Sequence, residues 1–364
     1  MAPRVAVMAG GTGGHVFPAL AVAEALRARG AEVFWIGTRA GMEASLVPRH
    51  GFELEWIGIS GVRGKGLLTL LRAPWQLARA IREAAVILRR RAPDLVLGMG
   101  GFVAGPGGLS ARLQGRPLVI QEQNSVPGLT NQWLARIATA VFEAFPGSFP
   151  AARRAVTSGN PVRAAIAALP PPASRLDRVA SGDAGGPARL LVVGGSLGAR
   201  TLNQQVPQAL ALLPEAARPL VRHQAGERTL ELARAAYAEA GVTAEVVPFI
   251  DDMAAAYAWA DLVVCRAGAL TVSELAAAGL PAILIPFPYA VDDHQVGNAR
   301  YLSEAGAARL ILERELTPVG LAQQLVHLLG DPALRRDMGE AAHRQARVDA
   351  AETIACVCLE LIGR

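Results

Sequence analysis

Lysine is almost absent from this sequence: Lys65 is the only one, and arginine supplies nearly all of the positive charge. A nucleotide-binding P-loop needs a lysine that is followed by serine or threonine, whereas Lys65 is followed by Gly66. The chain is therefore not a P-loop nucleoside triphosphatase.

Cysteine and long hydrophobic runs are also scarce. The three cysteines, Cys265, Cys356 and Cys358, form no Cys-x-x-Cys pair and support neither a disulfide framework nor a structural zinc site. The apolar stretch 95–110 is interrupted by glycines and a proline, and a bilayer span takes ~20 residues. The first four residues lead directly into a strand and leave no room for a signal peptide. We expect a cytoplasmic protein that touches a membrane without crossing it.

Charged residues make up only 18% of the 364 residues and hydrophobic residues 52%, which is typical of a globular protein of two domains. The formal net charge of +5 suits phosphate-rich ligands or an anionic surface. It does not require nucleic acid, and we expect no nucleic-acid partner.

Glycine, in contrast, is abundant and gathers in loops that follow apolar strands. The first loop, 10–15, joins a strand at 4–9 to a helix expected over 18–29. Glycine lets a ligand approach the main chain, and the free N–H groups at a helix start attract anions. The pattern predicts a site for a diphosphate or an oxyanion. The alternative, a tight strand–helix turn, leaves His15 and two further glycine loops unexplained.

The first unit of the sequence is not a dinucleotide-binding unit. Such a unit would place an acidic residue after the second strand, 32–37, and Gly-x-Gly-x-x-Gly at the first turn, and both are missing. A second glycine loop, 100–108, and a polar run, 122–125, each follow a predicted strand, where open α/β sheets bind ligands. The polar run could also be an ordinary turn.

The opening pattern of strand, glycine loop and helix recurs at 189–193, 194–200 and 201–213. This weak repeat predicts an α/β protein of two doubly wound, Rossmann-like domains that face one another across a cleft. Between the two halves, 158–163 is typical of a hinge and 170–187 of a flexible polar insertion.

The domain boundaries follow from these features. We predict an N-terminal domain over 1–160 and a C-terminal domain over 161–340. A last helix within about 341–364 is long enough to return to the first domain.

Residues 67–91 predict a long amphipathic helix in which leucine and tryptophan alternate with arginine. A basic helix of this kind is typical of an interfacial membrane contact. A helix that faces the core and exposes its arginines explains the pattern equally well. The residues that would touch the membrane are Leu68, Leu71, Arg72, Trp75, Arg79 and Arg82.

Two acidic features stand out in the second half. Glu274 lies in the first turns of a helix that starts at 268–271, where a carboxylate either holds sugar or ribose hydroxyls or stabilises the helix dipole. The succession Asp292, Asp293 and His294 could indicate a metal, but on a loop it more often forms hydrogen bonds. We expect no metal.

A series of motifs follows along nearly the whole chain, at 10–18, 98–101, 105–108, 122–124, 159–163, 194–196, 249–253, 266–274 and 295–299. In this order they resemble the MurG family of peptidoglycan glycosyltransferases, which add N-acetylglucosamine to lipid-linked muramyl-pentapeptide. Only 170–187 and 288–291 look peculiar to this chain, and the latter leaves open the loop geometry beside Gln295.

The resemblance implies a GT-B fold with no cofactor. The second domain would hold UDP-N-acetylglucosamine, with the uracil at the backbone of Ile250, the ribose at Glu274 and the diphosphate at Ser196. The first domain would hold the acceptor, undecaprenyl-pyrophosphoryl-N-acetylmuramyl-pentapeptide, at the anionic cytoplasmic surface of the membrane. The donor-binding residues implied are Thr12, Gly13, Gly14, Asn124, Arg163, Ser196, Ile250, Ala269, Leu270, Thr271, Val272, Ser273, Glu274 and Gln295.

The reaction implied is one inverting displacement, in which the muramyl 4-hydroxyl attacks the anomeric carbon and UDP leaves. A sugar hydroxyl is a poor nucleophile at neutral pH, and a positioned base contributes roughly 10²–10⁴-fold. His15 is the candidate base because histidine titrates nearest pH 7. Alternatively, His15 donates a hydrogen bond to the phosphates or caps the helix. Helix N-termini and Ser196 would stabilise the leaving UDP.

Two other functions stay open. A UDP-N-acetylglucosamine 2-epimerase resembles the same twin-domain fold and needs acid/base carboxylates, for which Glu122 and Glu274 are the candidates. A non-catalytic sugar-nucleotide sensor would tolerate the loss of His15.

Overall fold

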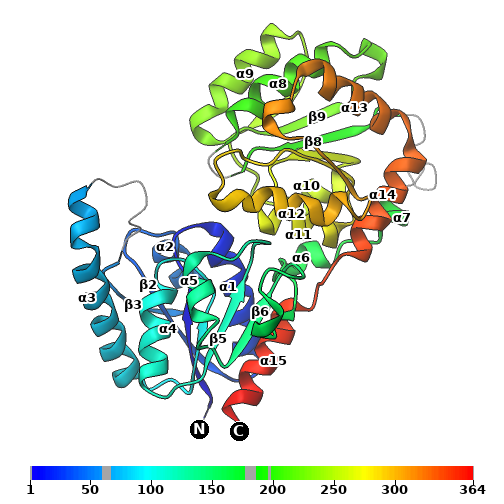
Figure 1. Cartoon of the computed structure of the whole chain (residues 1–364). Helices are drawn as coiled ribbons and strands as arrows, with labels where there is room; N and C mark the ends of the chain where they lie inside the picture. Colours follow the sequence, from blue (N-terminus) through cyan, green and yellow to red (C-terminus); the bar gives the residue numbers. More distant parts are fainter. Residues whose placement is uncertain (1, 60–66, 177–185, 196–197, 364) are drawn as a thin grey trace. The chain divides into compact units, whose positions relative to one another are not determined.

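The computed structural model describes residues 2–59, 67–176, 186–195 and 198–363, with backbone alone for 67–72, 176 and 291 (Figure 1). It divides into two compact units: Met1–Val162 with Arg347–Arg364, the N-terminal unit, and Arg163–Ala346, the C-terminal unit. Each unit is a parallel sheet with helices on both of its faces (Figure 1).

The N-terminal sheet has the order β3-β2-β1-β4-β5-β6-β7, and all of its pairs are parallel. Its strands are β1 (Arg4–Met8), β2 (Glu32–Gly37), β3 (Glu53–Trp56), β4 (Leu95–Gly98), β5 (Leu118–Glu122), β6 (Ala140–Glu143) and β7 (Val156–Thr157). The helices of this unit are α1 (Gly13–Ala28), α2 (Glu43–Arg49), α3 (Leu67–Arg91), α4 (Ala104–Leu113), α5 (Leu129–Leu134) and α15 (Ala350–Ile362).

Strand β1 shows why this sheet is covered on both faces. Val5 and Val7 are buried in a core cluster with residues of α1 and α15, whereas Ala6 and Met8 are buried in a second cluster with residues of α3 and α4. Successive side chains of a strand point to opposite faces, so an uninterrupted apolar strand needs helices on both.

The C-terminal sheet repeats the arrangement in the order β10-β9-β8-β11-β12-β13, again parallel. Its strands are β8 (Arg189–Val193), β9 (Leu220–Gln224), β10 (Glu245–Val247), β11 (Leu262–Cys265), β12 (Ala282–Leu284) and β13 (Ala308–Leu310). The helices are α6 (Ala164–Ala167), α7 (Pro172–Leu176), α8 (Arg200–Ala211), α9 (Leu230–Glu239), α10 (Met253–Trp259), α11 (Ala269–Ala278), α12 (His294–Ser303), α13 (Pro318–Gly330) and α14 (Pro332–Arg344). Short 3₁₀ helices lie at Ala151–Arg153, Glu215–Ala217, Glu227–Thr229, Val291–Asp293 and Glu313–Glu315.

Three predicted elements differ from the structure. The first helix begins at Gly13 rather than residue 18, because the carbonyl of Thr12 accepts hydrogen bonds from the N–H groups of His15 and Val16. Part of the insertion predicted to be flexible is the helix α7, and the Arg175 guanidinium ties it to the carbonyl of Pro170 at 2.8 Å. The rest of that insertion, 177–185, lies outside the described residues.

The predicted last helix is two helices, α14 in the C-terminal unit and α15 in the N-terminal unit. The polar residues between them interrupt the apolar repeat, and the carbonyl of Gln345 accepts a hydrogen bond from the Tyr301 hydroxyl at 2.8 Å. Helix α15 packs on α1, and its Ile354, Ala355 and Cys358 are fully buried in the core of the N-terminal unit.

Candidate active site

The first glycine loop is held in place by a buried carboxylate that the sequence analysis missed. Glu43, at the start of α2, accepts hydrogen bonds from the Gly11 N–H at 3.0 Å and from the N–H and hydroxyl of Thr38 at 2.9 and 2.8 Å. A Cβ on Gly10 would lie 2.6 Å from Glu43, and one on Gly37 would lie 2.7 Å away. These glycines therefore make room for the Glu43 side chain.

The N–H groups that remain at this loop belong to the first turn of α1. Thr12 is the exposed N-cap residue, and its side chain makes no capping hydrogen bond. Gly13 follows half-buried and Gly14 exposed, and their N–H groups precede the first helical hydrogen bonds. A helix start of this kind favours an anion.

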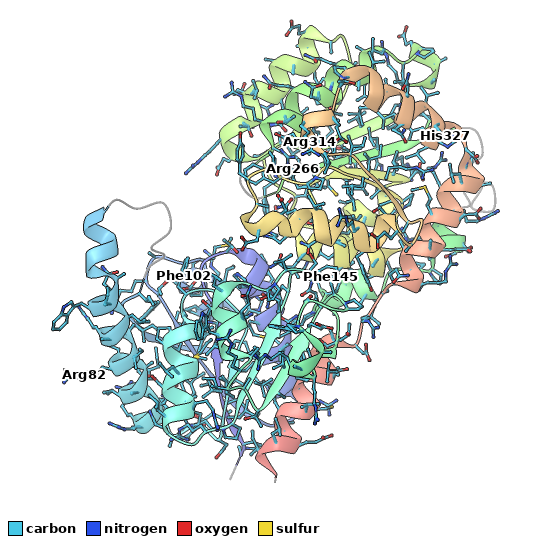
Figure 2. The ribbon with its side chains drawn as sticks, viewed as in Figure 1. Arg82, Phe102, Phe145, Arg266, Arg314 and His327 are labelled. Carbon is cyan, nitrogen blue, oxygen red and sulfur yellow. The ribbon has the colours of Figure 1, made fainter. Side chains whose placement is uncertain are left out.

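His15 lies in the same turn, half-buried, with its Nδ1 atom 2.7 Å from Oε1 of Gln123. Gln123 follows β5 and is almost completely buried. The second glycine loop lies against this pair: Gly100 has a φ of +92°, and a Cβ there would come within 2.5 Å of His15 Nδ1. Phe102, in the same loop, is half exposed (Figure 2).

Glu122 anchors the polar run that follows β5. Its Oε1 accepts hydrogen bonds from the N–H and side-chain amide of Asn124 at 3.0 and 3.2 Å, and its Oε2 from the N–H of Gly128 at 3.1 Å and the side-chain amide of Asn131 at 2.9 Å. Both oxygens of this buried carboxylate are thus occupied by the loop that it shapes. Asn124 itself is half-buried, with its orientation fixed by Glu122.

In the C-terminal unit, Glu274 on α11 is buried and Arg163 is the N-cap residue of α6. The guanidinium donates to Oε1 of Glu274 from Nε at 2.9 Å and from Nη2 at 2.8 Å. The Tyr257 hydroxyl donates to Oε2 at 3.3 Å. Burial raises the pKa of Glu274, and the Arg163 guanidinium opposes that rise.

Gly268 is the N-cap residue of α11. Only some of the predicted donor-binding residues in the first turns of this helix have exposed side-chain surface. Leu270 and Thr271 are half-buried, whereas the Val272 side chain is fully buried and its N–H donates to the Gly268 carbonyl at 3.0 Å. The Ser273 hydroxyl donates to the carbonyl of Ala269 at 3.0 Å. The side chain of Val272 thus belongs to the core.

Gln224, which the sequence analysis missed, joins the third glycine loop to the segment before Ile250. Its Oε1 accepts from the Gly195 N–H at 3.0 Å, and its Nε2 donates to the carbonyls of Gly195 at 3.1 Å and Pro248 at 2.9 Å. Ile250 is half-buried. Ser196 lies outside the described residues.

Gln295, in the first turn of α12, accepts a hydrogen bond from the Phe287 N–H at 2.9 Å. Arg266, after β11, lies over the Phe287 ring at 5.6 Å from its centroid and forms an ion pair with Glu313 (Figure 2). The residue before the loop 288–291, Phe287, is therefore held in place by Gln295 and Arg266. Within the described residues, no group of three or more His, Cys, Asp and Glu side chains could hold a metal ion.

Helix α3 has the predicted bounds, and its faces differ. Ala80, Ala84 and Leu88 are buried in the core, whereas Trp75 is 83% exposed. One side of α3 therefore faces the core, as the second interpretation predicts, and membrane contact at its exposed side stays a prediction. Arg79 pairs with Glu83 at 2.7 Å and Arg82 is exposed (Figure 2), while the side chains of Leu68, Leu71 and Arg72 lie outside the described residues.

Apolar side chains are also exposed on α4 and α5, and the sequence analysis missed them. Leu113 at the end of α4 is 74% exposed, and Leu129 and Trp133 on α5 are 57% and 65% exposed. Helix α4 packs against both α3 and α5. The Arg136 guanidinium lies 4.3 Å from the centre of the Trp133 ring.

Residues 5–143 match the Glycosyltransferase family 28 N-terminal domain, and residues 189–354 match the Glycosyltransferase family 28 C-terminal domain. The UDP-N-acetylglucosamine--N-acetylmuramyl-(pentapeptide) pyrophosphoryl-undecaprenol N-acetylglucosamine transferase of Nitrosococcus oceani is 58% identical over 99% of both chains. The crystal structure of Acinetobacter baumannii MurG is 41% identical with a TM-score of 0.83, covering 98% of this chain and 99% of that one. The chain belongs to the MurG family.

Membership of the MurG family confirms the predicted resemblance and the fold class of two Rossmann-like domains. A UDP-N-acetylglucosamine 2-epimerase is also similar, with a TM-score of 0.62 over 97% of this chain and 95% of that one. Its identity is only 15%, so this likeness shows the fold alone.

Proposed function

We propose that this chain transfers N-acetylglucosamine from UDP-N-acetylglucosamine to the 4-hydroxyl of undecaprenyl-pyrophosphoryl-N-acetylmuramyl-pentapeptide. The hydroxyl oxygen forms a β-1,4 bond to the anomeric carbon, the bond from that carbon to UDP breaks, and the configuration inverts. The observation that carries the proposal is the 58% identity, over 99% of both chains, to a relative of that name.

In this proposal the C-terminal unit binds the donor. A carboxylate oxygen accepts more than one hydrogen bond, so Oε2 of Glu274 can accept a ribose hydroxyl beside the Tyr257 hydroxyl. Arg163 pairs with the other oxygen and opposes the rise in the pKa of Glu274 that burial causes. The backbone of Ile250 takes the uracil, and Gln224 fixes the spacing between that segment and the diphosphate loop around Ser196.

The remaining donor contacts come from both units. The main-chain N–H groups at the start of α11, those of Leu270 and Thr271 among them, carry positive partial charge that favours the sugar-phosphate. Gln295 and Asn124 form hydrogen bonds with hexose hydroxyls, and the N–H groups of Gly13 and Gly14 donate to the diphosphate. These groups stabilise the negative charge that develops on the departing UDP.

The N-terminal unit supplies the base. His15 accepts the proton of the muramyl 4-hydroxyl as the new bond forms, which raises the nucleophilicity of the oxygen when it attacks. General-base catalysis of this kind contributes roughly 10²–10⁴-fold.

We further propose that the acceptor binds at the membrane surface, beside α3, α4 and α5. Trp75, Leu113 and Trp133 expose apolar side chains on these helices, Arg82 is exposed on α3, and the Arg136 guanidinium lies over the Trp133 ring. Exposed apolar side chains beside arginines suit the interface of an anionic bilayer. Among the described residues, none of the helices combines the length and hydropathy that a membrane crossing requires. The attachment proposed is peripheral, at the cytoplasmic face.

The deciding experiment measures UDP release from UDP-N-acetylglucosamine with and without the lipid-linked muramyl-pentapeptide, with the sugar products identified. We expect release that depends on the acceptor and yields a disaccharide-lipid. Conversion to the manno-epimer without acceptor would establish the epimerase instead. Binding of the donor with no turnover in either condition would leave a sugar-nucleotide sensor.

The structure favours the transferase over the epimerase for one specific reason. Glu122 is one of the two candidate acid/base carboxylates, yet four hydrogen bonds from its own loop occupy both of its oxygens. A group that must give and take protons during turnover needs an oxygen free to reach the substrate.

A further inference from the structure

The contact between His15 and Gln123 has a direction that the neighbouring hydrogen bonds decide. A glutamine side chain presents an oxygen that only accepts and an NH₂ group that only donates. The Nε2 atom of Gln123 lies 2.9 Å from the carbonyl oxygen of Met99 and also donates to Oε1 of Gln121. Both partners are acceptors, so the NH₂ group must face them. The oxygen, Oε1, therefore faces His15.

The tautomer of His15 follows directly. Because Oε1 of Gln123 can only accept, the Nδ1 atom of His15, 2.7 Å away, carries the hydrogen. In the neutral imidazole the other nitrogen, Nε2, then carries the lone pair. With Gln123 rotated by 180° about its last bond, an NH₂ group would face Nδ1 and an oxygen would face the Met99 carbonyl. That arrangement sets two acceptors against each other in a buried place.

Gln123 cannot easily rotate, because a chain of buried amides holds it. The side-chain NH₂ of Asn160 donates to the main-chain carbonyl of Gln123 at 3.0 Å. The Oδ1 atom of Asn160 accepts from Nε2 of Gln121 at 3.2 Å. Gln121, Gln123 and Asn160 are all almost completely buried. Each side-chain amide fixes the orientation of the next, from Asn160 through Gln121 and Gln123 to His15 in the first turn of α1.

We propose that Gln123 is a positioning residue that keeps His15 in the tautomer with hydrogen on Nδ1, so that Nε2 accepts the proton of the acceptor hydroxyl. The inference rests on the proposed function, in which His15 is the base. Gln123 itself touches neither substrate. Gly100 is needed for this contact, because a Cβ at position 100 would lie 2.5 Å from Nδ1 of His15 and 3.2 Å from Oε1 of Gln123.

The test replaces Gln123 with methionine, which has a similar size and no amide. Long-range ¹H–¹⁵N spectra of protein labelled with ¹⁵N-histidine identify the hydrogen-bearing nitrogen of His15, whose signals are assigned by their loss in His15→Gln. We expect hydrogen on Nδ1 in the parent and on Nε2, at least in part, in Gln123→Met. The kcat should fall by about tenfold or more while the KM for UDP-N-acetylglucosamine changes less than about twofold.

Gln114→Met is the matched control, because Gln114 is a half-buried glutamine of the same unit that donates to a backbone carbonyl, that of Ala85, at 3.1 Å. It should leave both the spectrum and kcat unchanged. Gln123→Glu keeps an acceptor facing Nδ1 but sets its second oxygen against the Met99 carbonyl, so it should keep the parent tautomer in a less stable protein. If the methionine variant does not fold, the spectrum of the parent carries the test, because hydrogen on Nε2 of His15 there would overturn the inference.

An unchanged His15 tautomer in Gln123→Met, or a changed tautomer with kcat within twofold of the parent, would overturn the inference. Failure of the proposed function looks different. If His15→Ala kept full turnover, His15 would not be the base, although Gln123 could still be seen to set its tautomer.

Discussion

Arg163 and Glu274 are separated by 111 residues, yet the guanidinium donates two hydrogen bonds to one oxygen of the carboxylate, at 2.9 and 2.8 Å. The two ends of this ion pair differ in exposure: the Arg163 side chain is 43% exposed, whereas that of Glu274 is 9% exposed. Removing one partner therefore has a different consequence from removing the other. A guanidinium left alone here is hydrated, but a carboxylate left alone stays buried.

We expect Arg163→Met to lower the free energy of unfolding by about 2 kcal/mol or more, because it leaves a buried carboxylate without its cation. Glu274→Gln should cost about 1 kcal/mol or less, since the amide oxygen still accepts and Arg163 faces solvent. Urea unfolding at pH 7.5 measures both. Equal losses in the two variants would contradict the asymmetry.

Both variants should also raise the KM for UDP-N-acetylglucosamine, because the proposed ribose contact needs an ionised, oriented carboxylate. Donor affinity measured by calorimetry separates this effect from the change in stability. Unaltered donor affinity in Glu274→Gln would show that the charge of this carboxylate does not contribute to donor binding.

His15→Ala should lower kcat by at least about tenfold and leave donor affinity nearly unchanged, because the base acts on the acceptor hydroxyl. His50→Ala is the matched control: His50 is an exposed histidine of the same unit, paired with Glu24 at 2.8 Å. Steady-state kinetics with both substrates decides the matter. Turnover of His15→Ala within twofold of the parent would exclude His15 from the mechanism.

The strands and glycine loops could be predicted because their signals are local. The run Val5 to Met8 is apolar at every position, which only a strand covered on both faces can satisfy. The capping of α10 by Asp252, whose carboxylate accepts from the Ala255 N–H at 2.9 Å, is equally local.

The groups that support the site could not be predicted, because their partners are distant in the sequence. Nothing beside Glu43 shows that it will accept hydrogen bonds from Gly11 and Thr38, and nothing beside Gln224 shows that it will join two loops. The break between α14 and α15 was missed for a related reason. The sequence has helical periodicity before and after the short polar segment 345–349. Whether such a segment ends a helix depends on what the helices on either side pack against.

The exposed apolar side chains of α3 and α5 predict binding to anionic vesicles. Replacing Trp75 and Trp133 together with serine should weaken the binding to phosphatidylglycerol vesicles by about tenfold or more, because two exposed aromatic side chains are lost. Arg82→Glu should weaken it too, and added salt should diminish that second effect. Cosedimentation measures the bound fraction.

The control for this surface is a pair of exposed apolar residues on the C-terminal unit, Leu212 and Val326, replaced with serine. These substitutions remove two exposed apolar side chains from another place. If they weakened vesicle binding as much as the tryptophan substitutions, general hydrophobicity rather than this face would explain the attachment.

His223 predicts how stability changes with pH. It lies on β9 and is fully buried, and burial lowers its pKa to about 3. Asn203 donates its amide hydrogens to the carbonyls of Ala225 and Thr229, so its Oδ1 faces His223 and accepts from Nε2 at 3.0 Å. Nδ1 then accepts from the Tyr237 hydroxyl at 3.0 Å. The neutral imidazole is satisfied on both sides.

Between pH 6.5 and about 3 the unfolded chain binds a proton at His223 and the folded chain does not. Stability therefore falls as pH falls through this window, by about 2 kcal/mol between pH 7.5 and pH 5 for this one group. The raised pKa of Glu274 acts in the opposite direction at acidic pH, so the comparison must be between variants. His223→Gln does not titrate, and its unfolding free energy should decline by about 2 kcal/mol less than the parent's between these two pH values. Parallel decline of parent and variant in urea unfolding would mean that His223 is protonated in the folded protein as readily as in the unfolded chain.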